Sequence, residues 1–226
     1  MATHLDLEEQ EQLDQLKSFW KQYGNLITWV LILALGSYAA WNGWRWWQRD
    51  QAVKAGAMYD ELDRVAQAGD ADKAGRIFAD MKERFPGTAF TAQAGLLAAR
   101  TQFEKGQADN ARATLGWVAE NAKETEVQTI ARLRLAGVLL DEKKFDEALR
   151  QLDAATAKEF EALVADRRGD VLLAQGKKDE AKAAYLRAWK AMDARAEYRR
   201  LIDAKLTALG APPEAAVPAA SAAASQ

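Results

Sequence analysis

The chain has 226 residues, among them 31 lysines and arginines, 33 aspartates and glutamates, one histidine and no cysteine, for a formal net charge of −2. This near-neutral balance argues against a nucleic-acid-binding protein, because such proteins concentrate positive charge on one surface. The absence of cysteine excludes thiol catalysis, cysteine metal sites and disulfides.

An acidic leader over residues 1–24 precedes the longest apolar stretch of the chain. Residues 1–10 are compatible with a docking helix or with a solvated acidic tail, and the solvated tail is the favoured interpretation. From Leu13 to Tyr23 the apolar side chains recur at helical spacing. This pattern predicts a short amphipathic helix that lies along a membrane surface before Gly24 turns the chain inward.

A stretch without any charged side chain covers residues 22–44, bordered by Lys21 and Arg45. A helix rises ~1.5 Å per residue, so about 20 such residues cross the hydrocarbon core of a bilayer. The core helix of a soluble protein would keep a polar face, and a signal peptide would be shorter and end in small residues. We therefore predict a retained transmembrane helix over residues 25–47. The side chains expected at its membrane interfaces are Trp20, Trp41, Trp44, Arg45, Trp46 and Trp47.

The charges that flank this segment leave its orientation open. Lys17 and Lys21 precede it, and Arg45, Arg49 and Lys54 follow it. The positive-inside rule leans toward a cytoplasmic C-terminal domain, but only by one residue, and large domains translocate regardless of such counts.

The remainder of the chain repeats itself. Four alanines at the start of predicted helices are spaced by 37, 37 and 33 residues, and a large apolar side chain follows each alanine four residues later. The alanine allows a partner helix to approach closely, and the larger side chain fills the next turn on the same face. These pairs are Ala74 and Phe78, Ala111 and Leu115, Ala148 and Leu152, and Ala181 and Tyr185.

The repeated units resemble the tetratricopeptide repeat, although Lys143 replaces the turn glycine of the third unit. The predicted fold is all-α, a single transmembrane helix followed by a solenoid of about four helix pairs and a capping helix. The repeat domain is expected over residues 48–209, and the Ala- and Pro-rich tail over 210–226 is expected to be disordered. The predicted pairs are 52–68 with 71–85, 89–105 with 108–121, 126–142 with 145–156, and 162–175 with 178–192, and the capping helix is 195–209.

Nothing in the sequence predicts a catalytic, metal or cofactor site. The single histidine, His4, lies in the leader, and no glycine-rich phosphate loop is present. Helical repeats instead form a concave surface lined by the first helix of each pair. Such a groove suits extended or helical peptides, whereas any single residue there could equally pack between helices. The residues projected onto the groove are Leu96, Arg100, Phe103, Glu104, Leu133, Leu140, Asp141, Asp166 and Asp170.

Three stretches together resemble one family: LKSFWKQYGN at 16–25, GWRWW at 43–47 and ADRRGDVLLAQGK at 165–177. This is the YfgM family of ancillary SecYEG translocon subunits of Gram-negative bacteria. The resemblance implies an inner-membrane protein with its N-terminus in the cytoplasm and its repeat domain in the periplasm, opposite to the lean of the charge count. It also implies that the partners are the SecYEG translocon, a PpiD-like periplasmic chaperone, unfolded exported proteins and membrane lipid, without nucleic acid.

The function expected on this basis is that of a non-enzymatic adaptor with a chaperone-like role in protein export. Its repeat groove would bind protein partners or newly exported clients in the periplasm. The alternative is a repeat scaffold for another envelope machine, such as one for cell-wall synthesis or division.

Overall fold

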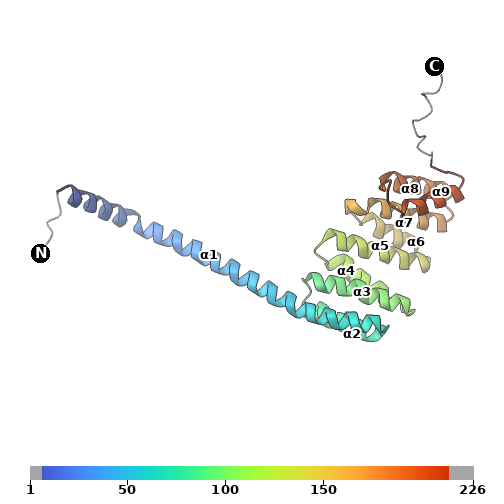
Figure 1. Ribbon diagram of the computed structural model, residues 1–226, viewed down its shortest axis with the longest axis horizontal. Helices are drawn as coiled ribbons and strands as arrows, with labels where there is room; N and C mark the ends of the chain where they lie inside the picture. The colour runs from blue at the N-terminus through green and yellow to red at the C-terminus, as the bar shows by residue number, and fades with distance from the viewer. Residues whose placement is uncertain (1–6, 214–226) are drawn as a thin grey trace, which may run out of the picture. The chain divides into compact units, whose positions relative to one another are not determined.

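The computed structural model describes residues 7–213 of the chain, and all regular structure within this range is helical (Figure 1). The prediction of an all-α fold is therefore confirmed. The elements are α1 (Leu7–Gln67), α2 (Ala71–Arg84), α3 (Ala89–Glu104), α4 (Ala108–Asn121), α5 (Thr125–Asp141), α6 (Phe145–Asp153), the short 3-10 helix η1 (Lys158–Phe160), α7 (Glu161–Ala174), α8 (Lys178–Ala191) and α9 (Arg199–Ala208). Most of the predicted tail, from residue 214 on, lies outside the described residues, as does the start of the leader.

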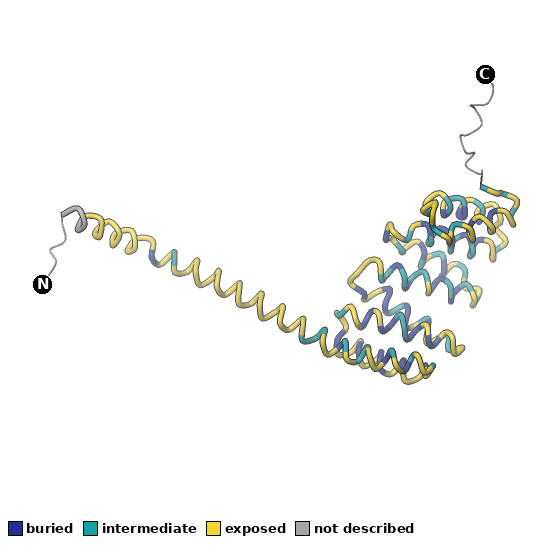
Figure 2. The backbone as a smooth tube through the Cα atoms, viewed as in Figure 1, coloured by how far each residue is buried: buried dark blue, intermediate teal, exposed yellow. Residues whose placement is uncertain are grey.

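The chain divides into two compact units, one up to Gln51 and the other from Ala52 onward. The described part of the first unit consists of α1 alone, and nearly all of its residues are exposed (Figure 2). Leu33 is 66% exposed and Trp46 is 70% exposed. This helix is long and apolar enough to cross a membrane by length and composition, and only 6% of its apolar window is buried. An unburied apolar surface of this kind is suited to lipid.

Helix α1 continues through Gly24, where the sequence had predicted a change of direction. One glycine inside a helix costs only about 1 kcal/mol relative to alanine, which is too little to end a long helix. The Trp20 ring covers Gly24 closely, since a Cβ at Gly24 would lie 3.2 Å from Nε1 of Trp20. The Thr28 hydroxyl donates a hydrogen bond to the Gly24 carbonyl at 2.8 Å. Gly24 is thus a contact site for the Trp20 ring, and not a turn.

The second unit is a stack of four helix pairs with a capping helix, as predicted (Figure 1). The last part of α1, from Ala52, contributes Ala55, Leu62 and Val65 to the same core cluster as α2. The following pairs are α3 with α4, α5 with α6 and α7 with α8, and α9 packs on α8. Every neighbouring pair shares apolar contacts, so the core runs along the stack as each unit covers the open face of the next.

The alanine and large-residue pattern fixes how the pairs pack. All four repeat alanines are fully buried, and Phe78, Leu115, Leu152 and Tyr185 are at most 3% exposed. The turns also recur, because the second residue after the first helix of each pair adopts a positive φ, as in a Schellman motif. Lys143 does so with φ 59° and keeps the same bond, its N–H donating to the Leu140 carbonyl at 2.9 Å. The loss of glycine there changes the side chain and not the turn.

A matched pair of glycine substitutions tests this packing. A Cβ at Gly169 would lie 2.5 Å from Cδ1 of the buried Tyr185 ring, whereas a Cβ at Gly116 would meet nothing within 4 Å. We expect Gly169→Ala to lower the free energy of unfolding by about 1–3 kcal/mol through overpacking. We expect Gly116→Ala to raise it by about 0.5–1 kcal/mol, because alanine favours the helix interior. Thermal unfolding of the full chain in detergent, followed by circular dichroism, measures both; equal midpoints for the two variants would contradict this packing.

Candidate functional site

The repeat domain, the second compact unit, contains a cavity of about 530 Å³ between the first helices of its helix pairs. These helices are neighbours, since α3 contacts α5 and α5 contacts α7. The cavity has an apolar floor and a charged rim. Its lining residues are Ala99, Arg100, Phe103 and Glu104 of α3, Leu115 of α4, Arg134, Gly137, Val138 and Asp141 of α5, and Arg167 of α7.

The residues projected onto the groove from the sequence divide into three groups. Arg100, Phe103, Glu104 and Asp141 line the cavity. The core cluster that joins α3 to α7 is covered by three partly buried leucines, Leu96, Leu133 and Leu140. Asp166 and Asp170 lie in an ion-pair network at the last helix. For all nine of these residues, a role in binding remains a prediction.

Two arginines of the cavity were missed by the sequence analysis. Arg134 and Arg167 each lie nine residues before the positive-φ turn residue of their repeat, Lys143 and Gly176. This recurrence at one repeat position was the signal that could have identified them. A register projected from single helices does not show it, because long side chains reach the neighbouring repeat.

The guanidinium groups of the cavity differ in their partners. Arg100 Nε donates to Glu104 Oε1 at 2.7 Å, and this bond raises the pKa of Arg100. Arg134 Nη1 donates to the backbone carbonyl of Leu96 at 3.2 Å. Burial, and then the charge of Arg100, lower the pKa of Arg134. Within the described range no carboxylate forms an ion pair with Arg134.

Asp166 anchors the capping helix to the last repeat. It is 2% exposed, and Lys205 Nζ lies 2.8 Å from each of its carboxylate oxygens. The Tyr198 hydroxyl donates to Asp166 Oδ2 at 2.8 Å. Lys205 also donates to Asp170 Oδ1 at 2.7 Å, and the Tyr185 hydroxyl donates to the same oxygen at 2.8 Å. A buried carboxylate needs such partners, and here they hold α9 against α7 and α8.

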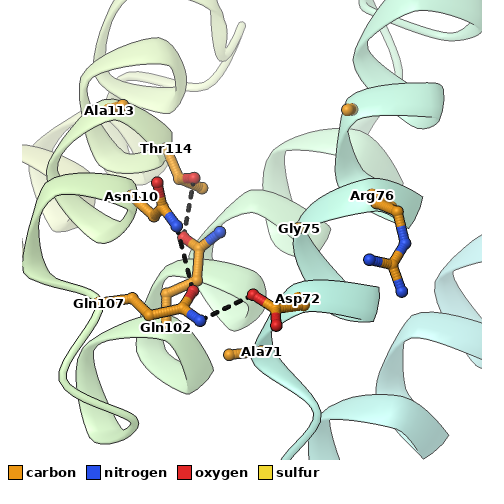
Figure 3. Close-up of a pocket in the computed structure, with 10 residues that line it drawn as sticks. Ala71, Asp72, Gly75, Arg76, Gln102, Gln107, Asn110, Ala113 and Thr114 are labelled. Atoms are coloured by element: carbon orange, nitrogen blue, oxygen red, sulfur yellow. Dashed lines mark hydrogen bonds between the residues drawn. The ribbon is translucent and has the colours of Figure 1, made fainter.

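A second cavity of about 410 Å³ lies beside the second helices α2 and α4 (Figure 3). Most of its polar side chains bond to one another. Gln107 Nε2 donates to Asp72 Oδ1 at 2.8 Å, and Asn110 Nδ2 donates to Gln107 Oε1 at 3.1 Å. The Thr114 hydroxyl donates to Gln102 Oε1 at 2.9 Å. Because these groups satisfy one another, this cavity is a weaker candidate than the arginine-lined one.

The predicted membrane-interface residues lie on α1 in the first unit. All six side chains are exposed, from Trp20 to Trp47. The ring centroids of Trp44 and Trp47 are 5.1 Å apart, and Cζ of Arg45 lies 6.0 Å from the Trp41 ring centroid. Amphipathic aromatic and arginine side chains of this kind suit the headgroup region. Their contact with lipid remains a prediction.

The part of the chain that the structure describes holds no group of three or more histidine, cysteine, aspartate or glutamate side chains that could bind a metal ion.

Comparison with known proteins places these features in one family. The tetratricopeptide repeat-like domain family matches residues 17–211. An ancillary SecYEG translocon subunit of Neisseria gonorrhoeae is 34% identical over 92% of this chain and 100% of its own length. Proteins with the same name from Haemophilus influenzae and Escherichia coli are 30% and 28% identical, over 79% and 78% of this chain and 87% and 85% of their own lengths. The family predicted from the three sequence stretches is confirmed.

The Asp166 network predicts a loss of stability at alkaline pH. Burial, and then the hydrogen bond to Asp166, raise the pKa of Tyr198 to about 12 from the usual 10.0. A raised tyrosine pKa stabilises the fold below pH 10, and this stabilisation is lost as the pH rises toward 12. We expect the unfolding midpoint of the wild type to fall across this window, and that of Tyr198→Phe to start lower and fall less. Thermal unfolding as a function of pH measures both, and parallel profiles for the two proteins would contradict the assignment.

Proposed function

The chain belongs to the family of ancillary SecYEG translocon subunits, and on that premise we propose that it is a non-enzymatic adaptor at the Sec translocon. In this proposal it spans the inner membrane once, with the N-terminus in the cytoplasm and the repeat domain in the periplasm. The cavity between α3, α5 and α7 binds protein partners or newly exported clients. The partners are the translocon itself and a PpiD-like periplasmic chaperone.

The cavity between the first helices is the observation that carries this proposal. It combines an apolar floor, formed by Ala99, Leu115 and Val138, with charged side chains at its rim. Phe103 is 43% exposed at its edge. An extended peptide can place an apolar side chain on such a floor and polar groups on such a rim. A partly open cavity of mixed character suits varied clients better than one rigid ligand.

The apolar surface of α1 supports the anchor. A helix with this exposure would aggregate in water, and lipid removes that liability. Tethering at the membrane raises the effective concentration of the repeat domain for other membrane-bound partners, so modest affinity at the groove is sufficient. The name carried by the relatives favours the translocon over an envelope machine for cell-wall synthesis or division.

Site-specific photo-crosslinking tests this function in intact cells. Phe103 is replaced by a photoreactive phenylalanine analogue in the full chain. Ala113, exposed beside the second cavity, receives the same analogue as the matched control. We expect adducts with exported proteins, the chaperone or translocon subunits from position 103, and few from position 113.

Two outcomes of this experiment count against the proposal. Adducts from position 103 with cytoplasmic proteins alone would overturn it. Adducts with cell-wall or division enzymes, without translocon subunits, would favour the alternative scaffold.

A further inference from the structure

We propose that the cavity between α3, α5 and α7 binds an acidic segment of a partner protein, which places carboxylates on Arg100, Arg134 and Arg167 and an apolar side chain beside Phe103. This inference rests on the proposed function, because it specifies the chemistry of the segment that the groove binds. It commits to a protein segment, and free anions are outcomes of the test.

Three positive charges from three successive repeats converge on one cavity. Arg100 belongs to α3, Arg134 to α5 and Arg167 to α7, and all three line the same space. Like charges in one partly enclosed site repel one another. Arg134 keeps an exposed surface, and its partial desolvation, and then the charge of Arg100, disfavour its charged form. A bound carboxylate would remove this cost, so the convergence favours an anionic ligand.

Arg134 is the central group of this site. It bonds to the Leu96 carbonyl through Nη1, which fixes the guanidinium against the α3 backbone. A guanidinium has five N–H donors in a planar fork, which matches a carboxylate in bidentate fashion. Since no other hydrogen bond of Arg134 occurs among the described residues, the remaining donors can serve a ligand.

Two of the three acidic side chains near the cavity are already paired within the repeat domain, one of them with an arginine of the cavity itself. Glu104 is bound by Arg100 at 2.7 Å. Asp170 accepts hydrogen bonds from Lys205 and Tyr185, and its other oxygen is 3.6 Å from Arg167. Asp141 is the remaining carboxylate of the lining. The rim therefore has more guanidinium capacity than its own carboxylates use.

The apolar part of the lining distinguishes a peptide from a small anion. Ala99, Leu115 and Val138 form the floor, and Phe103 stands partly exposed at the edge. The Arg167 guanidinium lies beside Gly137 of α5, where a Cβ would be in ordinary van der Waals contact with Arg167 Cζ at 3.9 Å. Bound inorganic phosphate would leave this apolar floor exposed to water. An acidic segment with one apolar side chain would cover the floor and neutralise the rim together.

Peptide binding to the full chain in detergent micelles tests the proposal. The probe is a short fluorescent peptide rich in glutamate with one central phenylalanine, and its counterpart carries glutamine in place of every glutamate. We expect the acidic peptide to bind at least about tenfold more tightly at low salt, because each charge-assisted pair contributes on this order. We expect this preference to shrink as salt is added, since salt screens the partly exposed charges.

Three substitutions assign the binding to the arginines. Arg134→Gln and Arg167→Gln should each weaken the acidic peptide by about tenfold and leave the glutamine peptide unchanged. Arg150→Gln on α6, an exposed arginine outside the cavity, is the matched control and should leave both unchanged. Circular dichroism checks folding, and Arg167→Gln keeps the test valid if Arg134→Gln unfolds the domain.

The proposal is overturned if the two peptides bind equally, or if the Arg150 control weakens binding as much as the cavity variants. Displacement of the acidic peptide by equimolar inorganic phosphate would also overturn it, in favour of a small-anion site. If Phe103 still crosslinks to exported proteins while the acidic preference is absent, the proposed function survives and this inference alone fails. If the acidic peptide binds through the arginines but position 103 gives no crosslinks to exported proteins, the chaperone or translocon subunits, the anionic site stands and the proposed function fails.

Discussion

Close approach of neighbouring helices at small residues is the interaction on which the repeat domain depends. At Gly95 of α3, a Cβ would lie 2.8 Å from Cε2 of Phe78 on α2, and Val118 of α4 stands against the same position. Gly169 of α7 stands against the ring of Tyr185 on α8 in the same way. Because the second helices fit so closely against the first, the first helices line up along one side of the stack. Ala99, one turn after Gly95, then becomes part of the cavity floor.

The fold followed from the sequence because its signals are local. The small-then-large pattern, such as Ala111 and Leu115, repeats on one helix face and gives the number and order of the pairs. The turns were predictable for the same reason, and even Lys143 keeps the left-handed conformation of its glycine counterparts. Gly24 was an exception, since the helix continues across it and Trp20 covers it. The helix predicted over 145–156 also ends earlier, at Asp153, and the capping helix predicted from 195 begins at Arg199.

The site was predicted only in part, because its chemistry depends on contacts between repeats. Arg134 reaches a carbonyl on the preceding first helix, 38 residues earlier in the chain. Asp166 was placed in the groove by register, yet its oxygens bond to Lys205, 39 residues later. Neither contact can be predicted from the residue pattern of a single helix. The repeat register alone placed Arg100, Phe103, Glu104 and Asp141 on the first helices, and all four line the cavity.

The central claim of this account is that a membrane-anchored repeat domain receives protein segments on the periplasmic side of the inner membrane. Protease accessibility tests it most directly: cells with a permeabilised outer membrane are treated with protease, and the repeat domain is probed beside a cytoplasmic control protein. The account predicts that the repeat domain is digested while the control stays intact. Protection of the repeat domain until the inner membrane is broken would contradict it. That result would place the domain in the cytoplasm, as the one-residue excess of positive charge after the apolar segment indicates.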